Sequence, residues 1–174
     1  MHPAPRLSLA FVALATCGSA FAAGPGPVKT YSGEAAMPPD REQREVAALF
    51  DRWNAALATG NPSEVVALYA PDGILQPTVS NEVRVGPDAI NRYFVDFLKL
   101  EPRGTINYRE VRVLDADTAL DSGVYTFAIT KDGKPAQVQA RYTYVYEKVD
   151  GEWKIVNHHS SAMPEPVPAQ AAAR

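Results

Sequence analysis

The chain has 174 residues, of which 46% are hydrophobic and 21% charged, and its net charge at pH 7 is −3. This length and apolar content suit one domain with its own core. No stripe of lysines and arginines occurs, so we do not expect nucleic acid as a partner. The single cysteine, Cys17, excludes an internal disulfide.

Residues 1–22 have the pattern of an export signal. Arg6 precedes the apolar stretch 7–15, and residues 20–22 have the small-x-small form of a cleavage site. The apolar stretch is too short to span a bilayer, so we expect no membrane attachment once the signal is removed. The predicted location is the periplasm or the cell exterior. A lipoprotein anchored through Cys17 is the less favoured alternative, because the residue before it fits a lipoprotein site poorly.

The folded unit is predicted to span residues 40–163. Residues 23–39 are rich in glycine and proline and are interpreted as a flexible leader. Residues 164–174 are interpreted as a disordered tail, because they contain too few large apolar side chains to build a core.

Three helices are predicted in the first half of this unit. The first is capped by Asp40 and ends at Gly60, and the second begins at 61–62 and ends before Pro71. The third begins at 86–88 and ends at 102–104. Their apolar stripes are Val46, Leu49, Phe50, Trp53 and Leu57, then Val65, Leu68 and Tyr69, then Ile90, Tyr93, Phe94, Phe97 and Leu98.

Strand patterns follow the helices. Two short strands are predicted at 72–77 and 82–85, before the third helix. Four longer ones are predicted at 105–114, 118–130, 137–148 and 153–161, separated by turn residues at 115–117, 131–133 and 150–151. Such short connections require antiparallel neighbours. The order of elements predicts an α+β fold in which a curved sheet wraps the helices.

The last predicted hairpin contains three alternating tyrosines. A turn at 150–151 places Tyr146 opposite Ile155, Tyr144 opposite Asn157 and Tyr142 opposite His159. One face then has apolar bulk with convergent polar tips, which is typical of a small-molecule pocket. The alternative is an ordinary amphipathic sheet with half-buried tyrosines.

Several segments of the unit resemble a known superfamily. They are 53–60 (WNAALATG), 68–73 (LYAPDG), 75–78 (LQPT), 86–90 (GPDAI) and 151–164 (GEWKIVNHHSSAMP). Together they resemble the nuclear transport factor 2-like superfamily. Within it they are similar to bacterial relatives of the calcium/calmodulin-dependent protein kinase II association domain and to the SgcJ/EcaC-type and SnoaL-like groups.

This resemblance implies a cone-shaped α+β fold, with three N-terminal helices packed in a curved, mostly antiparallel sheet. It also implies self-association, as a homodimer or larger ring, and a cavity for a small organic ligand. The resemblance does not extend to kinase activity, because the chain has no phosphate-covering glycine-rich loop.

The pocket residues are predicted from the strand pairing of the last hairpin and from matching to the kinase relative. Matching to the kinase relative places Gln76, Tyr125, Tyr144 and Ser160 where that protein has one glutamate and three arginines, so the positive charge is lost. Matching directs Ser160 into the cavity, whereas ideal pairing directs His159 there, and a bulge in the last strand would reconcile the two. We favour His159. The predicted pocket residues are Trp53, Tyr69, Gln76, Tyr93, Tyr125, Tyr142, Tyr144, Asn157 and His159.

Candidate catalytic groups are few. His159 is a candidate base, Tyr144 is a candidate for polarising a carbonyl, and Asp121 is a candidate proton shuttle inside an apolar run. The alternative for Asp121 is a residue at the rim or at a strand edge, facing water or Arg112. Arg109 and Arg141 could also pair with Asp121 or Glu110 across the outer face. Metal binding is disfavoured because His158 and His159 are adjacent on a strand and point to opposite faces.

We therefore expect no cofactor and no metal. The favoured function is an exported, oligomeric small-molecule-binding or scaffold module without kinase activity of its own. The alternative is a small-molecule lyase or isomerase, or an SgcJ/EcaC-type oxidoreductase, that uses a histidine and tyrosine pocket.

Overall fold

A computed structural model describes residues 28–164, and the predicted export signal and most of the predicted tail lie outside this range. The elements are α1 (Arg41–Ala58), α2 (Pro62–Val66), β1 (Tyr69–Gln76), β2 (Arg84–Val85), α3 (Gly86–Phe97), a 3₁₀ turn (Leu98–Leu100), β3 (Arg103–Val113), β4 (Thr118–Lys131), β5 (Lys134–Val149) and β6 (Glu152–Ala162). The strands form one sheet in the order β2-β1-β6-β5-β4-β3. Only the β1–β6 pair is parallel within the described range, so the predicted α+β class with a mostly antiparallel sheet is confirmed.

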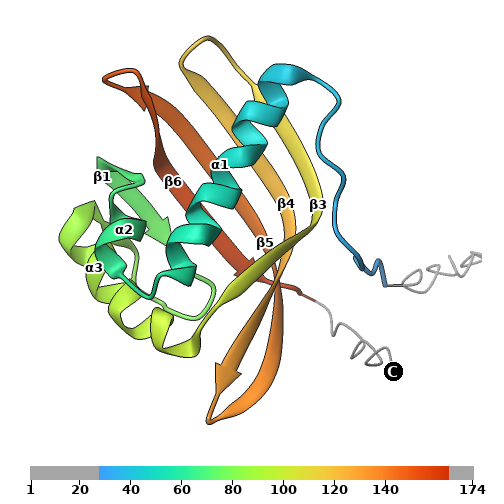
Figure 1. Ribbon diagram of the computed structural model, residues 1–174, viewed down its shortest axis with the longest axis vertical. Helices are drawn as coiled ribbons and strands as arrows, with labels where there is room; N and C mark the ends of the chain where they lie inside the picture. The colour runs from blue at the N-terminus through green and yellow to red at the C-terminus, as the bar shows by residue number, and fades with distance from the viewer. Residues whose placement is uncertain (1–27, 165–174) are drawn as a thin grey trace, which may run out of the picture.

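Helix α1 lies across the concave face of the sheet, in front of β3 to β6 (Figure 1). Its first turn is capped by Asp40, whose side chain accepts a hydrogen bond of 3.0 Å from the Gln43 amide. The predicted apolar stripe is fully buried against the sheet, with Trp53 only 2% exposed. This helix therefore covers part of the concave face of the sheet.

The second predicted helix is shorter than expected. Helix α2 ends at Val66, and Tyr69 is the first residue of β1. The reason is that the Leu68 carbonyl accepts a hydrogen bond of 2.9 Å from the Ile155 amide, which brings the chain into the sheet beside β6. Tyr69 is buried, but as a strand residue.

The register shifts in three strand pairs of the described sheet, one of them between Tyr69 and Ile74 of β1. In β3 the shift lies between Ile106 and Tyr108, just before Arg109 pairs with Gly123 of β4. A Cβ atom at Gly123 would lie 1.9 Å from the Tyr108 carbonyl oxygen, so only glycine allows this close approach. In β6 the shift lies between Ile155 and Asn157, which leaves Val156 as the extra residue.

The described part of the predicted leader packs on the sheet. The Ala35 amide donates to the Ile106 carbonyl at 2.8 Å, and the Gln139 side chain donates to the Tyr31 carbonyl at 2.9 Å. The ring of Tyr31 lies 5.5 Å from that of Tyr108. Composition alone did not predict these contacts.

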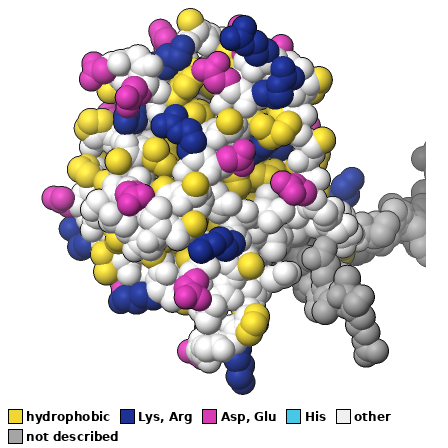
Figure 2. Space-filling view, viewed as in Figure 1, with side chains coloured by type: hydrophobic (Ala, Val, Ile, Leu, Met, Phe, Trp, Pro, Cys, Tyr) yellow, Lys and Arg dark blue, Asp and Glu magenta, His cyan; other side chains and the backbone are white. Residues whose placement is uncertain are grey.

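The surface that α1 crosses has both signs of charge. Figure 2 shows basic and acidic side chains interspersed over this face, with small apolar patches between them. Among residues 28–164, no helix is long and apolar enough to cross a membrane.

Candidate functional site

A small cavity of about 70 Å³ is lined by side chains of α3, of Trp53 from α1, and of β1, β4, β5 and β6. Aromatic and aliphatic side chains form most of its wall, and the polar groups come from β6, β4 and the segment after β1. Its lining residues are Trp53, Leu75, Pro77, Thr78, Val79, Tyr93, Phe94, Phe97, Leu100, Tyr125, Phe127, Ile129, Val138, Ala140, His158 and Ser160. A site for one water needs about 10–15 Å³ on this measure, so the cavity has room for a small organic group.

The β6 bulge decides which residues face inward. Because Val156 is inserted, Tyr144 pairs with His158 and Tyr142 pairs with Ser160. The predicted register is therefore wrong from Asn157 onward. His159 is exposed on the opposite face and Asn157 is half-buried there, so neither lines the cavity.

His158 is the buried histidine at the cavity wall, with 3% exposure. Its Nδ1 atom lies 2.9 Å from the Tyr69 hydroxyl, and its ring stacks on Tyr144 with centroids 4.1 Å apart. Burial lowers the pKa of His158 to about 3, so the imidazole is neutral at pH 7. Its Nε2 atom has no hydrogen-bond partner among residues 28–164.

A chain of hydroxyl groups forms the second polar part of the wall. The Tyr125 hydroxyl donates to Ser160 Oγ at 2.5 Å, and Ser160 Oγ also contacts Thr78 Oγ1. Burial raises the pKa of Tyr125 well above its ordinary value, so this phenol keeps its proton at neutral pH. The wall is therefore polar but uncharged at this point.

A buried ion pair lies on the same face of the sheet, outside the cavity lining. Arg109 Nε is 3.1 Å from Asp121 Oδ2, and the Tyr142 hydroxyl donates to Asp121 Oδ1 at 2.9 Å. Asp121 is fully buried. The expected pairing of Asp121 with Arg109 is confirmed. The expected place at the rim or on the outer face is wrong, because Asp121 is buried and its cross-strand neighbour Tyr144 lies on the inner face. Burial raises the pKa of Asp121 to about 6, against the opposing effect of the Arg109 charge.

The remaining predicted pocket residues are distributed around the cavity. Tyr69, Tyr142 and Tyr144 are buried behind its wall, and Gln76 is half-buried in β1 beside His159. Of the predicted set, Trp53, Tyr93 and Tyr125 line the cavity. Tyr144 touches it only indirectly, through its stack on His158.

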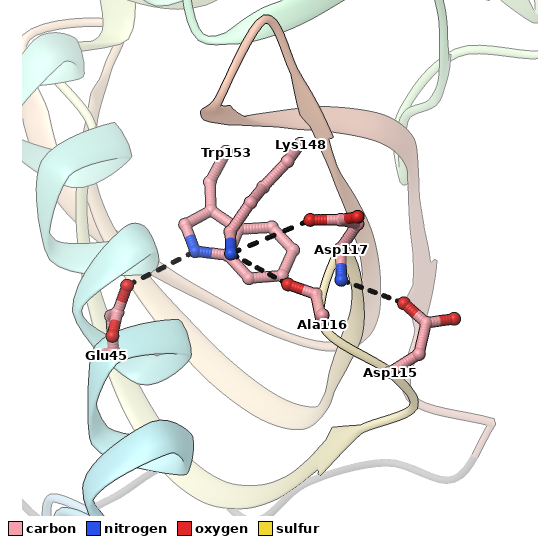
Figure 3. Close-up of polar contacts among 6 residues, drawn as sticks. All are labelled: Glu45, Asp115, Ala116, Asp117, Lys148 and Trp153. Carbon is pink, nitrogen blue, oxygen red and sulfur yellow. Dashed lines mark hydrogen bonds and ion pairs between the residues drawn. The ribbon is translucent and has the colours of Figure 1, made fainter.

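A second, open cleft of about 510 Å³ lies at the start of α1 (Figure 3). Lys148 Nζ lies 4.9 Å from the centroid of the Trp153 ring and donates to the Ala116 carbonyl at 2.7 Å. Trp153 in turn donates to Glu45 at 3.4 Å. These contacts join the β5–β6 hairpin to α1 and to the β3–β4 turn, which gives the cleft a structural role. Nowhere in residues 28–164 do three or more His, Cys, Asp or Glu side chains form a metal-binding group.

Comparison with known proteins identifies the family. The family model for the calcium/calmodulin dependent protein kinase II association domain matches residues 42–164. A protein from Xanthomonas campestris with the same family description is 64% identical, covers 80% of this chain and all of its own, and has a TM-score of 0.78. The chain belongs to the calcium/calmodulin dependent protein kinase II association domain family.

More distant structures share the fold. The hub homology domain of this kinase from Chlamydamonas reinhardtii is 27% identical over 68% of this chain and 96% of its own, with a TM-score of 0.58. A candidate scytalone dehydratase from Novosphingobium aromaticivorans is 18% identical over 70% and 84%, with a TM-score of 0.62. A dehydratase candidate of the NTF2-like family also matches, so the nuclear transport factor 2-like fold is confirmed.

Sequence reasoning missed several residues of this association domain's cavity. His158 was placed on the outer face, and only a bulge that no single sequence reveals turns it inward. Phe94 and Phe97 appeared in the third helical stripe as core, and their apolar character gave no sign that they border a cavity. Pro77 and Thr78 lie in the loop after β1. A loop has neither the helical nor the strand periodicity, so no pattern indicated that these residues line the cavity.

Proposed function

We propose that the protein is an exported, self-associating module that binds a small molecule in the cavity beside α3 and has no kinase activity of its own. The observation that carries the proposal is the apolar cavity whose wall contains His158 Nε2, a buried polar atom without a partner in the described range. Apolar lining with few convergent polar groups is the usual make-up of a ligand site.

Self-association is supported by the family. The relatives carry the names association domain and hub homology domain, which describe assembly in those proteins. We expect the purified protein to sediment as a dimer or larger species, well above the 18.8 kDa of one chain. A monomer at concentrations of tens of micromolar would contradict this part of the proposal.

Ligand binding is tested separately with a variant that fills the cavity. Ala140 is 1% exposed and lines the cavity from β5, so Ala140→Leu places three further carbon atoms inside it. A ligand found in a thermal-shift screen should stabilise the unsubstituted protein and not Ala140→Leu. Since this residue faces inward, both proteins should have the same oligomeric mass.

Export is tested at the N-terminus. If residues 1–22 act as a signal, the protein recovered from the bacterial periplasm or medium begins at Ala23, which mass spectrometry of the intact chain reveals. A product that keeps its first residues and stays in the cytoplasm would contradict export without affecting the cavity.

One observation favours a second function, a lyase or isomerase. His158 has the position that the sequence assigned to His159, and it is the polar group placed to contact the carbonyl of a bound substrate. Loss of turnover in His158→Gln, with binding and assembly retained, would support this reading. Unchanged turnover in that variant would exclude His158 from catalysis.

A further inference from the structure

The lining of the cavity carries no formal charge. Among the described residues that form it, none is lysine, arginine, aspartate or glutamate, and the titratable ones are Tyr93, Tyr125 and His158. Burial raises the pKa of Tyr93 to about 12, and the charge of Arg84 lowers it in opposition. The guanidinium of Arg84 is already paired with Glu82, at 3.0 Å. An anion entering this cavity would therefore lose its hydration without gaining a counter-charge.

The hydrogen bond between Tyr69 and His158 fixes the position of the imidazole proton. Burial raises the pKa of Tyr69 well above its ordinary value and lowers that of His158, so the phenol keeps its proton and the imidazole is neutral. The Tyr69 hydroxyl lies 2.9 Å from His158 Nδ1, and the neighbouring Trp53 side chain lowers the pKa of Tyr69 against the effect of burial. If Tyr69 donates to Nδ1, the hydrogen of the neutral ring is on Nε2.

The opposite tautomer costs more. With its hydrogen on Nδ1, His158 would donate to the Tyr69 oxygen, and the phenol hydrogen would be buried without an acceptor. An unpaired buried donor is destabilising, and in this tautomer the lone pair of Nε2 would lack a partner as well. The favoured tautomer also leaves one donor unpaired, Nε2–H, but that atom belongs to a ring that lines the cavity, where a ligand can reach it.

The hydroxyl groups of the wall near His158 are already engaged with one another, because Tyr125 donates to Ser160, and Ser160 contacts Thr78. His158 and Ser160 are two residues apart in β6 and face the same side. Two buried nitrogen atoms of lining residues have no hydrogen-bond partner among residues 28–164, His158 Nε2 and Trp53 Nε1. With hydrogen on Nε2 both are donors, and Tyr93, Phe97 and Phe127 add aromatic surface to the same cavity.

We propose, as an extension of the ligand-binding function above, that the cavity selects small uncharged molecules with one hydrogen-bond-accepting oxygen. The oxygen accepts from His158 Nε2–H, and the apolar body packs against the aromatic wall. Carboxylates of the same shape are rejected. This selectivity comes from the uncharged lining and the unpaired Nε2–H donor, and it makes His158 a specificity-determining residue.

Three probes of nearly the same shape test the proposal. Acetophenone carries a carbonyl, isopropylbenzene replaces it by an apolar branch, and benzoate replaces it by a carboxylate that is ionised at pH 7. Titrations of the full-length protein, followed by NMR, should give tighter binding of acetophenone than of isopropylbenzene by about tenfold, the scale of one buried hydrogen bond. Benzoate should bind more weakly than either.

Variants of His158 separate the hydrogen bond from the shape of the site. His158→Phe keeps a flat ring and removes the donor, so the preference for acetophenone over isopropylbenzene should disappear. His158→Gln restores an N–H donor and should restore part of the preference. The chemical shifts of the imidazole nitrogens should also show hydrogen on Nε2 at pH 7.

The outcomes distinguish this inference from the proposed function. If benzoate binds most tightly, or if the hydrogen is on Nδ1, the inference is wrong and the cavity is still a ligand site. If isopropylbenzene and acetophenone bind equally, the donor has no role and the inference fails alone. If no probe binds, and a wider thermal-shift screen finds no ligand that stabilises the unsubstituted protein more than Ala140→Leu, both proposals fail.

Discussion

The concave face of the sheet has two buried polar regions. Burying polar groups costs free energy unless they are paired, and the two regions differ in how far their groups are paired. One is the cavity wall at His158, and the other is the ion pair of Arg109 with Asp121. Both are surrounded by aromatic rings. At the ion pair, the charges face each other and Tyr142 completes the contact. At the cavity, an uncharged ring keeps one polar atom without a partner.

The difference indicates which region is structural and which is open to ligand. The Arg109 guanidinium lies 5.8 Å from the centroid of the Phe50 ring of α1, so the pair is packed beneath that helix. The cavity lies beside α3, whose side chains form part of its lining. A polar group next to empty volume can gain a partner on binding, whereas the ion pair does not line the cavity and is out of reach of a ligand bound there.

The largest expected effect is at the ion pair. Asp121→Leu leaves the Arg109 charge buried and unpaired, because a guanidinium does not lose its proton in proteins. We expect the free energy of unfolding to fall by about 3–5 kcal/mol in urea titrations at pH 7. The double variant Arg109→Met with Asp121→Leu should recover most of that loss. If Asp121→Leu alone is as stable as the unsubstituted protein, the Arg109 guanidinium must reach water in that variant.

Removing one hydroxyl from each region gives a matched comparison. Tyr142→Phe removes a hydrogen bond to a carboxylate, and hydrogen bonds to charged groups contribute about 1.5–3 kcal/mol. Tyr125→Phe removes a bond to Ser160, which keeps its contact with Thr78, and neutral hydrogen bonds contribute about 0.5–1.5 kcal/mol. Thermal unfolding of both variants should therefore rank Tyr142→Phe as the less stable. Equal losses would mean that the two regions are energetically alike.

The sequence predicted the fold well because its elements follow local rules. Asp40 and Asn61 are helix caps, and the turns at 131–133 and 150–151 join strands whose alternation is clear. These rules act over a few residues, so a single sequence contains them. The α+β class followed from their order, and the family followed from the resemblance of particular segments, such as 151–164.

The candidate site was predicted less well, because its geometry depends on one inserted residue. Tyr144 was correctly placed on the inner face, but the shift at Val156 exchanged His159 for His158. A bulge is a property of the pairing between strands and leaves no periodic signal. The position of Asp121 had the same difficulty, because its partner Arg109 is in another strand.

The two regions should also respond to pH in opposite directions. For His158, the folded pKa is about 3 and the ordinary value is 6.5, so the unfolded chain binds the proton more tightly. This group therefore lowers stability as the pH falls from about 6.5 towards 3. For Asp121, the folded pKa is about 6 and the ordinary value is 3.8, so the folded chain binds the proton more tightly. That group lowers stability as the pH rises from about 4 to 6, and each slope is at most about 1.4 kcal/mol per pH unit.

Substitution separates the two opposing slopes. Relative to the unsubstituted protein, His158→Gln should gain stability as the pH is lowered from 6 to 4, because it has no imidazole to protonate on unfolding. Asp121→Asn should lose relative stability over the same decrease, because it lacks the carboxyl that takes up a proton in the folded state. Urea titrations at pH 4, 5 and 6 measure both. Parallel curves for His158→Gln and the unsubstituted protein would mean that the pKa of His158 in the folded state is close to its ordinary value of 6.5, which contradicts a pKa lowered by burial.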